Sequence, residues 1–199
     1  MDFFDLEKIK GFLLSPVEAF NETKEDTIGD SLKYFLPLLV IYAVLSGVAS
    51  YFTLSAASSM MGSSMPFGMP GGGSAVGAIV SAMVGGILGV FVGGIILHIF
   101  VFIVGGRNGA QQTIKAVIYG YTPNLLIGWI PVVGAIGMLW SLVLEIVGIR
   151  EYHEISTVKA ILAVILPVII LAIIAVVLLG AFLLSMGGLG GTSTPYMMP

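Results

Sequence analysis

The sequence contains no cysteine, and charged residues make up only 10% of its 199 residues. The first absence excludes disulfides, thiolate metal sites and cysteine nucleophiles. The second excludes an ordinary water-soluble domain, which carries about 25% charged residues. A net charge of −3 supplies no basic field for nucleic acid, so no nucleic-acid partner is expected. With 57% apolar residues, the chain is predicted to be an integral membrane protein.

Motifs that would mark an enzyme or a cofactor site are also missing. No serine, histidine and acid set stands out, and no pair of carboxylates lies at membrane depth. The glycine-rich region lacks the G-K-[ST] of a nucleotide loop, and "EYHE" at 151–154 lacks the i, i+4 histidines of a zinc helix. We therefore predict no enzymatic activity, no cofactor and no metal site.

Two segments rich in Gly, Ser, Pro and Met offer one alternative to that prediction. They are "SAASSMMGSSMPFGMPGGGS" at 55–74 and "SMGGLGGTSTPYMMP" at 185–199, both of a composition typical of flexible chain. Thioether sulfur suits Cu(I), so weak copper capture is the alternative to incidental methionine. The methionines concerned are Met61, Met65, Met69, Met197 and Met198.

Long charge-free runs predict an all-α bundle of five transmembrane helices, because a helix needs about 20 mostly apolar residues to cross the bilayer. The run 111–147 is too long for one crossing and contains "GWIPVVG", a turn signal, so it is predicted to form a hairpin. One bent helix, giving four spans, is the alternative. The predicted spans are about 33–54, 74–104, 112–129, 131–147 and 158–185. A cytoplasmic arm (1–31), a membrane domain (32–186) and a flexible outer tail (187–199) follow.

All eight Lys and Arg residues fall on one side of this five-span topology. Cytoplasmic loops are enriched in these residues, so we expect a cell-membrane protein with its amino terminus in the cytoplasm and its carboxyl terminus outside. The charged segment "GIREYHEISTVKA" at 148–160 is then the last cytoplasmic loop, kept hydrated between two spans. Its candidate contacts with a protein partner are Arg150, Glu151, His153 and Glu154.

The arm has an amphipathic pattern with apolar residues every three or four positions. These residues are Phe3, Leu6, Ile9, Leu13, Val17 and Phe20. "SPVE" predicts a second helix with Ser15 as its cap, Pro16 at its first position and Glu18 completing a capping box. The apolar face either docks on the protein's own inner surface, inserts into the membrane interface or binds another protein.

The second predicted span carries small residues every four positions, a pattern that lets helices approach closely in lipid. They are Gly77, Ser81, Gly85, Gly89 and Gly93. We expect this face to pack against other spans or against a second copy in a homo-oligomer. His98, on the same helix, is ionisable at membrane depth and so is a candidate polar site; a hydrogen-bonded packing role is the alternative.

Three segments together resemble the YIP-domain family, the Ypt-interacting proteins and their prokaryotic relatives. They are "GFLLSPVEAF" in the arm, "AVIYGYTPNLL" in the third span and "LWSLVLEIVGIREYHEISTVKAILAVILPVII" from the fourth span into the fifth. The resemblance implies five spans and a cytoplasmic amino terminus. The short arm, and the lack of the acidic-Leu-Tyr-Gly-Pro motif of eukaryotic members, make the chain similar to the prokaryotic type.

The function expected from these features is that of a membrane scaffold or adaptor that contacts a cytoplasmic protein through its arm and loops, with the lipid bilayer around it. The main alternative is a small transporter or channel that uses the glycine-lined second span and His98. A membrane-shaping protein acting through the amphipathic arm is a third possibility.

Overall fold

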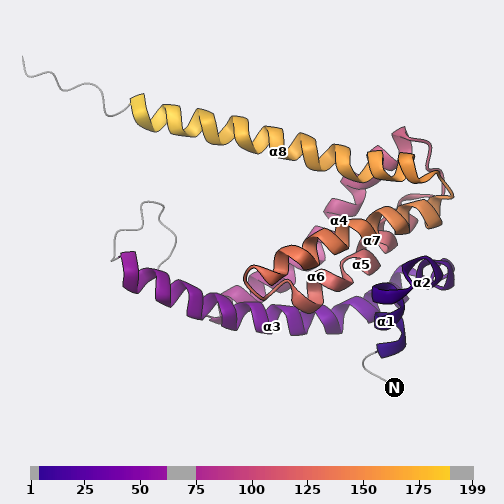
Figure 1. The fold of residues 1–199 in the computed structure, drawn as a ribbon, viewed down its shortest axis with the longest axis horizontal. Helices are drawn as coiled ribbons and strands as arrows, with labels where there is room; N and C mark the ends of the chain where they lie inside the picture. The colour runs from indigo at the N-terminus through magenta and orange to yellow at the C-terminus, as the bar shows by residue number, and fades with distance from the viewer. Residues whose placement is uncertain (1–4, 62–74, 189–199) are drawn as a thin grey trace, which may run out of the picture. The chain divides into compact units, whose positions relative to one another are not determined.

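The computed structural model describes residues 5–61 and 75–188, and the described residues form helices joined by short connections (Figure 1). Two compact units are present: unit 1 comprises Met1–Val164 and unit 2 Ile165–Pro199. The helices are α1 (Leu6–Leu14), α2 (Pro16–Glu22), α3 (Ile28–Met61), α4 (Ala75–Ile103), α5 (Ala110–Gly120), α6 (Thr122–Ile127), α7 (Val133–His153) and α8 (Thr157–Gly188). The all-α fold class is confirmed.

Four of these helices, α3, α4, α7 and α8, are long and apolar enough to cross a membrane. The chain is therefore a multi-pass membrane protein. α3 begins at Ile28, before the first predicted span, because Thr27 and Asp30 cap its first turn: the Thr27 hydroxyl donates to Asp30 Oδ2 (2.7 Å) and accepts from the Asp30 amide (3.2 Å).

The run 111–147 folds back on itself and so is not one bent helix, although the described residues contain four helices long enough to cross a membrane, the number that this alternative gives. Thr113 on α5 bonds to His153 at the end of α7, and Gly120 faces Glu145 farther along. These pairs make the α5–α6 limb antiparallel to α7, with the turn at 128–132 around Pro131.

The third predicted span is not one helix, because α5 ends at Gly120 and α6 starts at Thr122 with Pro123 in its first turn. At 1.5 Å per residue, the 11 residues of α5 rise about 16 Å. α6 adds 6 residues. This limb is short for a crossing and is not among the four described helices that are long enough for one.

The arm forms two helices that meet at Ser15, as the sequence predicts, but the capping box does not form. Ser15 holds the N-cap position of α2 without a side-chain hydrogen bond, and Pro16 occupies the first turn, where no amide donor is needed. The side-chain cap lies instead on α1, where Asp5 Oδ1 accepts from the Lys8 amide at 2.9 Å.

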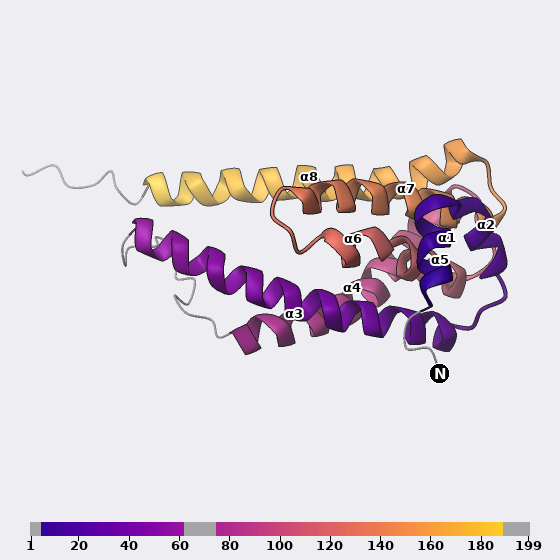
Figure 2. The ribbon, with the colours of Figure 1, turned by 60° about the horizontal axis from the view of Figure 1, so that its bottom comes forward.

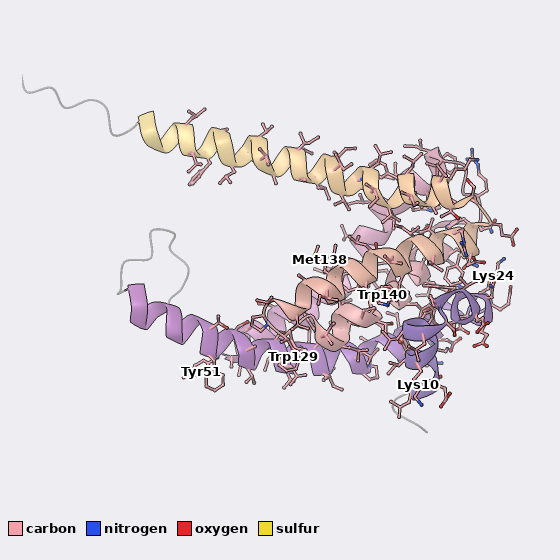
Figure 3. All side chains as sticks on the ribbon, viewed as in Figure 1. Lys10, Lys24, Tyr51, Trp129, Met138 and Trp140 are labelled. Atoms are coloured by element: carbon pink, nitrogen blue, oxygen red, sulfur yellow. The ribbon has the colours of Figure 1, made fainter. Side chains whose placement is uncertain are left out.

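Unit 1 has its densest core at one end, where α1 and α2 lie against α5 and α7 (Figure 2). The largest fully buried side chains there are aromatic: Phe12, Phe20, Tyr119 and Tyr152. Lys10 and Lys24 mark the same end in Figure 3, whereas Tyr51 and Trp129 lie toward the opposite end. The fold therefore concentrates both charge and buried aromatic area where the arm docks.

In unit 2, α8 continues from Ile165 as an apolar helix that contains Pro167 near its start. The methionine-rich loop at 62–74 and the tail at 189–199 lie outside the described residues. Copper capture by those segments stays a prediction.

Candidate functional site: the docked amino-terminal arm

Aromatic side chains anchor the arm on the bundle. Phe12 of α1 stacks on Tyr119 of α5 with ring centroids 4.8 Å apart, and Phe20 of α2 meets Tyr152 of α7 edge to face at 5.4 Å. The two phenylalanines also contact each other at 4.9 Å. Aromatic pairs in these geometries add about 0.5–1.5 kcal/mol each beyond the burial of their area. Of the three predicted roles for the arm, the structure shows docking on the protein's own surface.

Small residues allow this close fit. A Cβ atom added at Gly148 would lie 2.7 Å from the Phe20 ring and 3.1 Å from the Ala116 side chain. Glycine at 148 therefore leaves the space on α7 that the Phe20 ring fills.

Polar contacts fix the end of α2 against the end of α7. The hydroxyls of Thr23 and Tyr152 share a hydrogen bond of 2.7 Å, and both side chains are buried. Asn21 donates to Glu151 at 3.4 Å, and Lys24 forms an ion pair with Glu154. Hydrogen bonding from Lys24 holds the pKa of the Glu154 carboxyl below its ordinary value. Three side-chain contacts thus join the end of the arm to "EYHE".

A buried lysine of α5 also holds the arm in place. Lys115 is only 3% exposed, and its ammonium donates to the carbonyl oxygens of Lys24 and Asp26, each at 2.7 Å. Its Nζ also lies 5.0 Å from the centroid of the Tyr152 ring. The Asp26 carboxylate in turn accepts from Tyr119 and pairs with Lys8 at 3.1 Å. Lys115 therefore caps carbonyls of the α2–α3 connection.

The charged segment 148–160 is only in part the exposed loop that the sequence predicts: Glu154 and residues 156–159 are exposed, whereas residues 148–153 are buried or half-buried. α7 runs through it to His153, and only Glu154, Ile155 and Ser156 connect it to α8. The difference has a physical cause: the docked arm supplies partners for its polar side chains. Arg150 pairs with Glu151 beside it, Glu154 pairs with the arm, and His153 is 4% exposed.

His98 and His153 meet through one hydroxyl. His98 Nδ1 lies 2.8 Å and His153 Nε2 lies 2.9 Å from Thr113 Oγ1, and the two ring centroids are 5.9 Å apart. This cluster, called here the His98–Thr113–His153 bridge, joins α4, α5 and α7. His98 is therefore a hydrogen-bonded residue at a helix junction; a role in transport stays a hypothesis.

The predicted glycine face of α4 makes no close contact inside unit 1, although Gly85 and Gly89 line a cavity together with residues of α3 and α6. A Cβ atom added at Gly85, Gly89 or Gly93 would meet nothing within 4 Å among the described residues. The neighbouring positions make the contacts instead: Gly86 faces Leu39 of α3, and Gly94 faces Ile114 of α5 at 2.9 Å. Packing of the predicted face against a second copy therefore stays a proposal, as does the part played by Gly77 and Ser81.

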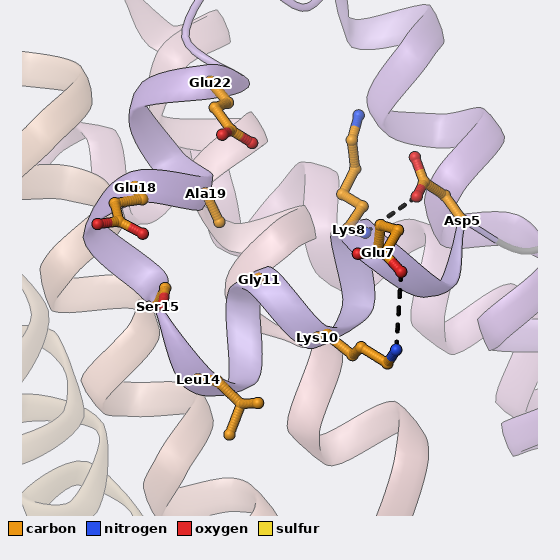
Figure 4. A pocket seen from close by; sticks show the side chains of 10 residues that line it. All are labelled: Asp5, Glu7, Lys8, Lys10, Gly11, Leu14, Ser15, Glu18, Ala19 and Glu22. Carbon is orange, nitrogen blue, oxygen red and sulfur yellow. Dashed lines mark hydrogen bonds and ion pairs between the residues drawn. The ribbon is translucent and has the colours of Figure 1, made fainter.

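Docking leaves an open notch between α1 and α2, a cavity of about 520 Å³ (Figure 4). Its lining residues are Asp5, Glu7, Lys8, Lys10, Gly11, Leu14, Ser15, Glu18, Ala19 and Glu22. Both lysines are paired, Lys8 with Asp26 and Lys10 with Glu7. Leu14 at the rim is 80% exposed. The notch is therefore acidic, with an apolar side chain at its edge.

This fold and this dock define a multi-pass helical membrane protein whose amino-terminal arm is folded onto its own bundle. The Yip1 domain matches residues 10–179, from the first helix of the arm into α8. The chain belongs to the Yip1 domain family, and the resemblance found in the sequence is confirmed. Searches of curated proteins and of solved structures found no match.

Several residues of the dock escaped the sequence analysis. The periodicity of the arm identified Phe20 as apolar, but nothing in the pattern paired it with Gly148. In the sequence, Lys115 counted only as one of the eight cations on one side of the topology, because a single lysine near a helix start gives no sign that backbone carbonyls will surround it. Thr113 carried no signal at all, since its role depends on two histidines 15 and 40 residues away.

Proposed function

We propose that this protein is a non-enzymatic membrane adaptor of Yip1-domain type that contacts a cytoplasmic protein through its docked arm. The observation that carries the proposal is the notch between α1 and α2. A surface helix whose only purpose was to dock would bury its apolar residues, yet Leu6 and Leu14 of α1 remain exposed, and Leu14 lines the notch. Glu18 and Glu22 line it without forming an ion pair among the described residues.

The chemistry of the notch indicates the kind of partner. A protein segment with basic side chains would pair with Glu18 and Glu22, while an apolar side chain would cover Leu14. Anionic lipid would meet the same carboxylates as like charge. A basic segment of a soluble protein is therefore favoured over the membrane surface as the occupant.

Five crossings and a cytoplasmic arm belong to the same proposal. Because the α5–α6 limb is antiparallel to α7, the connections around Arg107 and Arg150 lie at one end, where Asn108 donates to the Tyr152 carbonyl at 2.7 Å. The arm lies at that end too. If Lys and Arg mark the cytoplasmic side, the amino terminus faces the cytoplasm and the carboxyl terminus faces outward.

Single-cysteine labelling tests the topology, since the chain has no cysteine of its own. Ser156→Cys and Ser193→Cys are each exposed to an impermeant maleimide on intact cells. We expect labelling at 193 only, with 156 labelled after the membrane is opened. Labelling of 156 from outside would reject both the five-crossing topology and a cytoplasmic arm.

Site-specific photocrosslinking in intact cells tests the adaptor role. A photoreactive residue at Leu14 should give a discrete protein adduct, and Glu18→Lys with Glu22→Lys should abolish it. The matched control is the same residue at Lys33, which is exposed but outside the notch. Lipid adducts alone at Leu14, or one adduct pattern at both sites, would refute a notch-bound protein partner.

A small transporter or channel is the second candidate, favoured by a cavity of about 270 Å³ against the glycine face of α4. Gly85, Gly89, Tyr42, Tyr121 and Asn124 are among its lining residues. This alternative predicts solute flux in proteoliposomes that His98→Ala abolishes. An adaptor predicts that His98→Ala is tolerated in cells and that deletion of the arm is not.

A further inference from the structure

The two histidines of the chain, far apart in sequence, converge on Thr113. His153 is 4% exposed, and its second ring nitrogen, Nδ1, has no hydrogen-bond partner among the described residues. Buried polar atoms are normally hydrogen-bonded. A proton added at His153 Nδ1 would have no acceptor among the described residues.

The bridge fits neutral rings and does not fit charged ones. The Thr113 hydroxyl has one proton, so it donates to one neutral ring and accepts from the other. A proton added to either ring leaves an N–H at His153 Nδ1 without an acceptor, because a charged His153 has protons on both nitrogens and a charged His98 makes Thr113 donate to His153 Nε2. A second proton leaves both rings donating to Thr113 Oγ1. Two like charges would then lie with their ring centroids 5.9 Å apart.

The surroundings offer the imidazolium no compensation. On α5 the charged neighbour is Lys115, which faces the arm carbonyls, and in the α4–α5 connection it is Arg107, which lies over the Phe102 ring. On α8 the Lys159 ammonium lies near Gly105. On and after α7, the carboxylate of Glu151 is paired with Arg150 and that of Glu154 with Lys24 of the arm. Neither histidine forms an ion pair with a described residue.

The bridge also lies next to the contacts that hold the arm on α7. Tyr152 and Glu154, on either side of His153, bond to Thr23 and Lys24 of the arm. A shift of His153 away from Thr113 therefore moves the two residues that hold the end of α2. Protonation at the bridge and loss of the dock are linked through three consecutive residues of one chain.

We propose that the His98–Thr113–His153 bridge is an acid-sensitive latch: neutral rings keep the arm docked, and their protonation releases the end of α7 and with it the arm. Histidine is the side chain whose ordinary pKa, about 6.5, lies in the physiological range. The latch rests on the proposed function for its consequence, since it would control how the arm presents the notch to a partner.

Distance measurements between spin labels on the full-length protein in lipid nanodiscs test the latch. Lys10→Cys on the exposed side of α1 and Ser156→Cys before α8 carry the labels, and the pH is lowered from about 7.5 to about 4.5, across the ordinary titration range of histidine. We expect one narrow distance distribution at the higher pH and a loss of that peak at the lower pH. In His98→Asn/His153→Asn the peak should persist at both.

Two further variants keep the result interpretable. His98→Asn alone leaves the buried ring in place and removes one of the two charges, so release should move to lower pH without loss of the narrow peak near neutrality. Glu154→Gln removes the carboxylate that pairs with Lys24 of the arm and leaves both histidines in place, so it weakens docking and should move release to higher pH, opposite to His98→Asn.

The outcomes separate the latch from the adaptor. A narrow peak that persists at low pH in the natural sequence overturns the latch and leaves the adaptor intact, as does equal release in the histidine variants. Absence of the narrow peak near neutrality overturns the docked arm itself and therefore both proposals.

Discussion

The two ends of unit 1 are built on different principles. At the arm end, Phe35 and Leu39 of α3 are each 1% exposed, and α4 buries Val90, Leu97 and Val101. Toward the other end, Phe52 of α3 and Val76 of α4 are about two thirds exposed. In lipid an exposed apolar side chain carries no penalty, so the far end needs no dense core. The arm end, with its charges and hydrogen bonds, has to satisfy them within the protein.

Because of this contrast, functional residues are expected at the arm end. The apolar end tolerates change because its neighbours are lipid tails, whereas the arm end depends on specific pairs between segments distant in sequence. Substitutions made in matched pairs, one in each environment, either sharpen this contrast or break it.

The largest effect is expected at the anchors of the arm. Phe20→Ala should lower the free energy of unfolding by about 3 kcal/mol, because a fully buried aromatic side chain is lost and a cavity is left against Gly148 and Tyr152. Leu14→Ala, on the same arm but exposed, should change it by less than about 0.5 kcal/mol. Thermal unfolding in detergent measures both. Equal effects would mean that the arm is not docked in solution.

A smaller effect is expected on α4, where adjacent glycines face different surroundings. Gly94→Ala should destabilise by about 1–3 kcal/mol, because its Cβ would lie 2.9 Å from Ile114 Cγ1 and 3.3 Å from its Cα. Gly93→Ala has open space and gains helix propensity, so it should be neutral or slightly stabilising.

A larger substitution at Gly93 tests self-association. If the predicted face packs against a second copy, Gly93→Leu should lower the dimer fraction measured by light scattering of the detergent-solubilised protein. An unchanged dimer fraction, or a monomer in both proteins, would remove the homo-oligomer from consideration.

The smallest effect is expected for the ion pair between Lys24 and Glu154, in which the Glu154 side chain is largely exposed. The folded-state pKa of Glu154 lies below its ordinary value, so the pair contributes stability above that ordinary value and loses it as the pH falls through the lowered one. The natural sequence should therefore be more stable than Glu154→Gln near neutral pH. This difference in the free energy of unfolding should shrink as the pH falls below about 4.5, the ordinary pKa of this carboxyl. Urea unfolding at several pH values measures it; a difference that grows on acidification contradicts the assignment.

Much of the fold followed from local patterns. Apolar runs placed the long helices, "GWIPVVG" placed the turn of the hairpin, and "SPV" placed the break between α1 and α2. Each of these signals lies within a few residues of the feature that it specifies. The glycine pattern of α4 was read on the wrong face for packing inside unit 1, because two neighbouring rows of small residues run along that helix and sequence spacing does not distinguish them.

The site followed from the sequence only in part. The sequence singled out the charged segment and His98, but it treated the segment as a hydrated loop and the histidine as isolated.

The sequence by itself determined the environment of this protein: because the chain has few charges and long apolar runs, its helices lie in a lipid bilayer. The tertiary structure decided which polar groups would leave water. Lys115, Thr113 and His153 are buried because partners from other parts of the chain replace their hydration, and those partners lie 15 to 91 residues away. Such compensation depends on folded geometry, and local sequence carries no record of it.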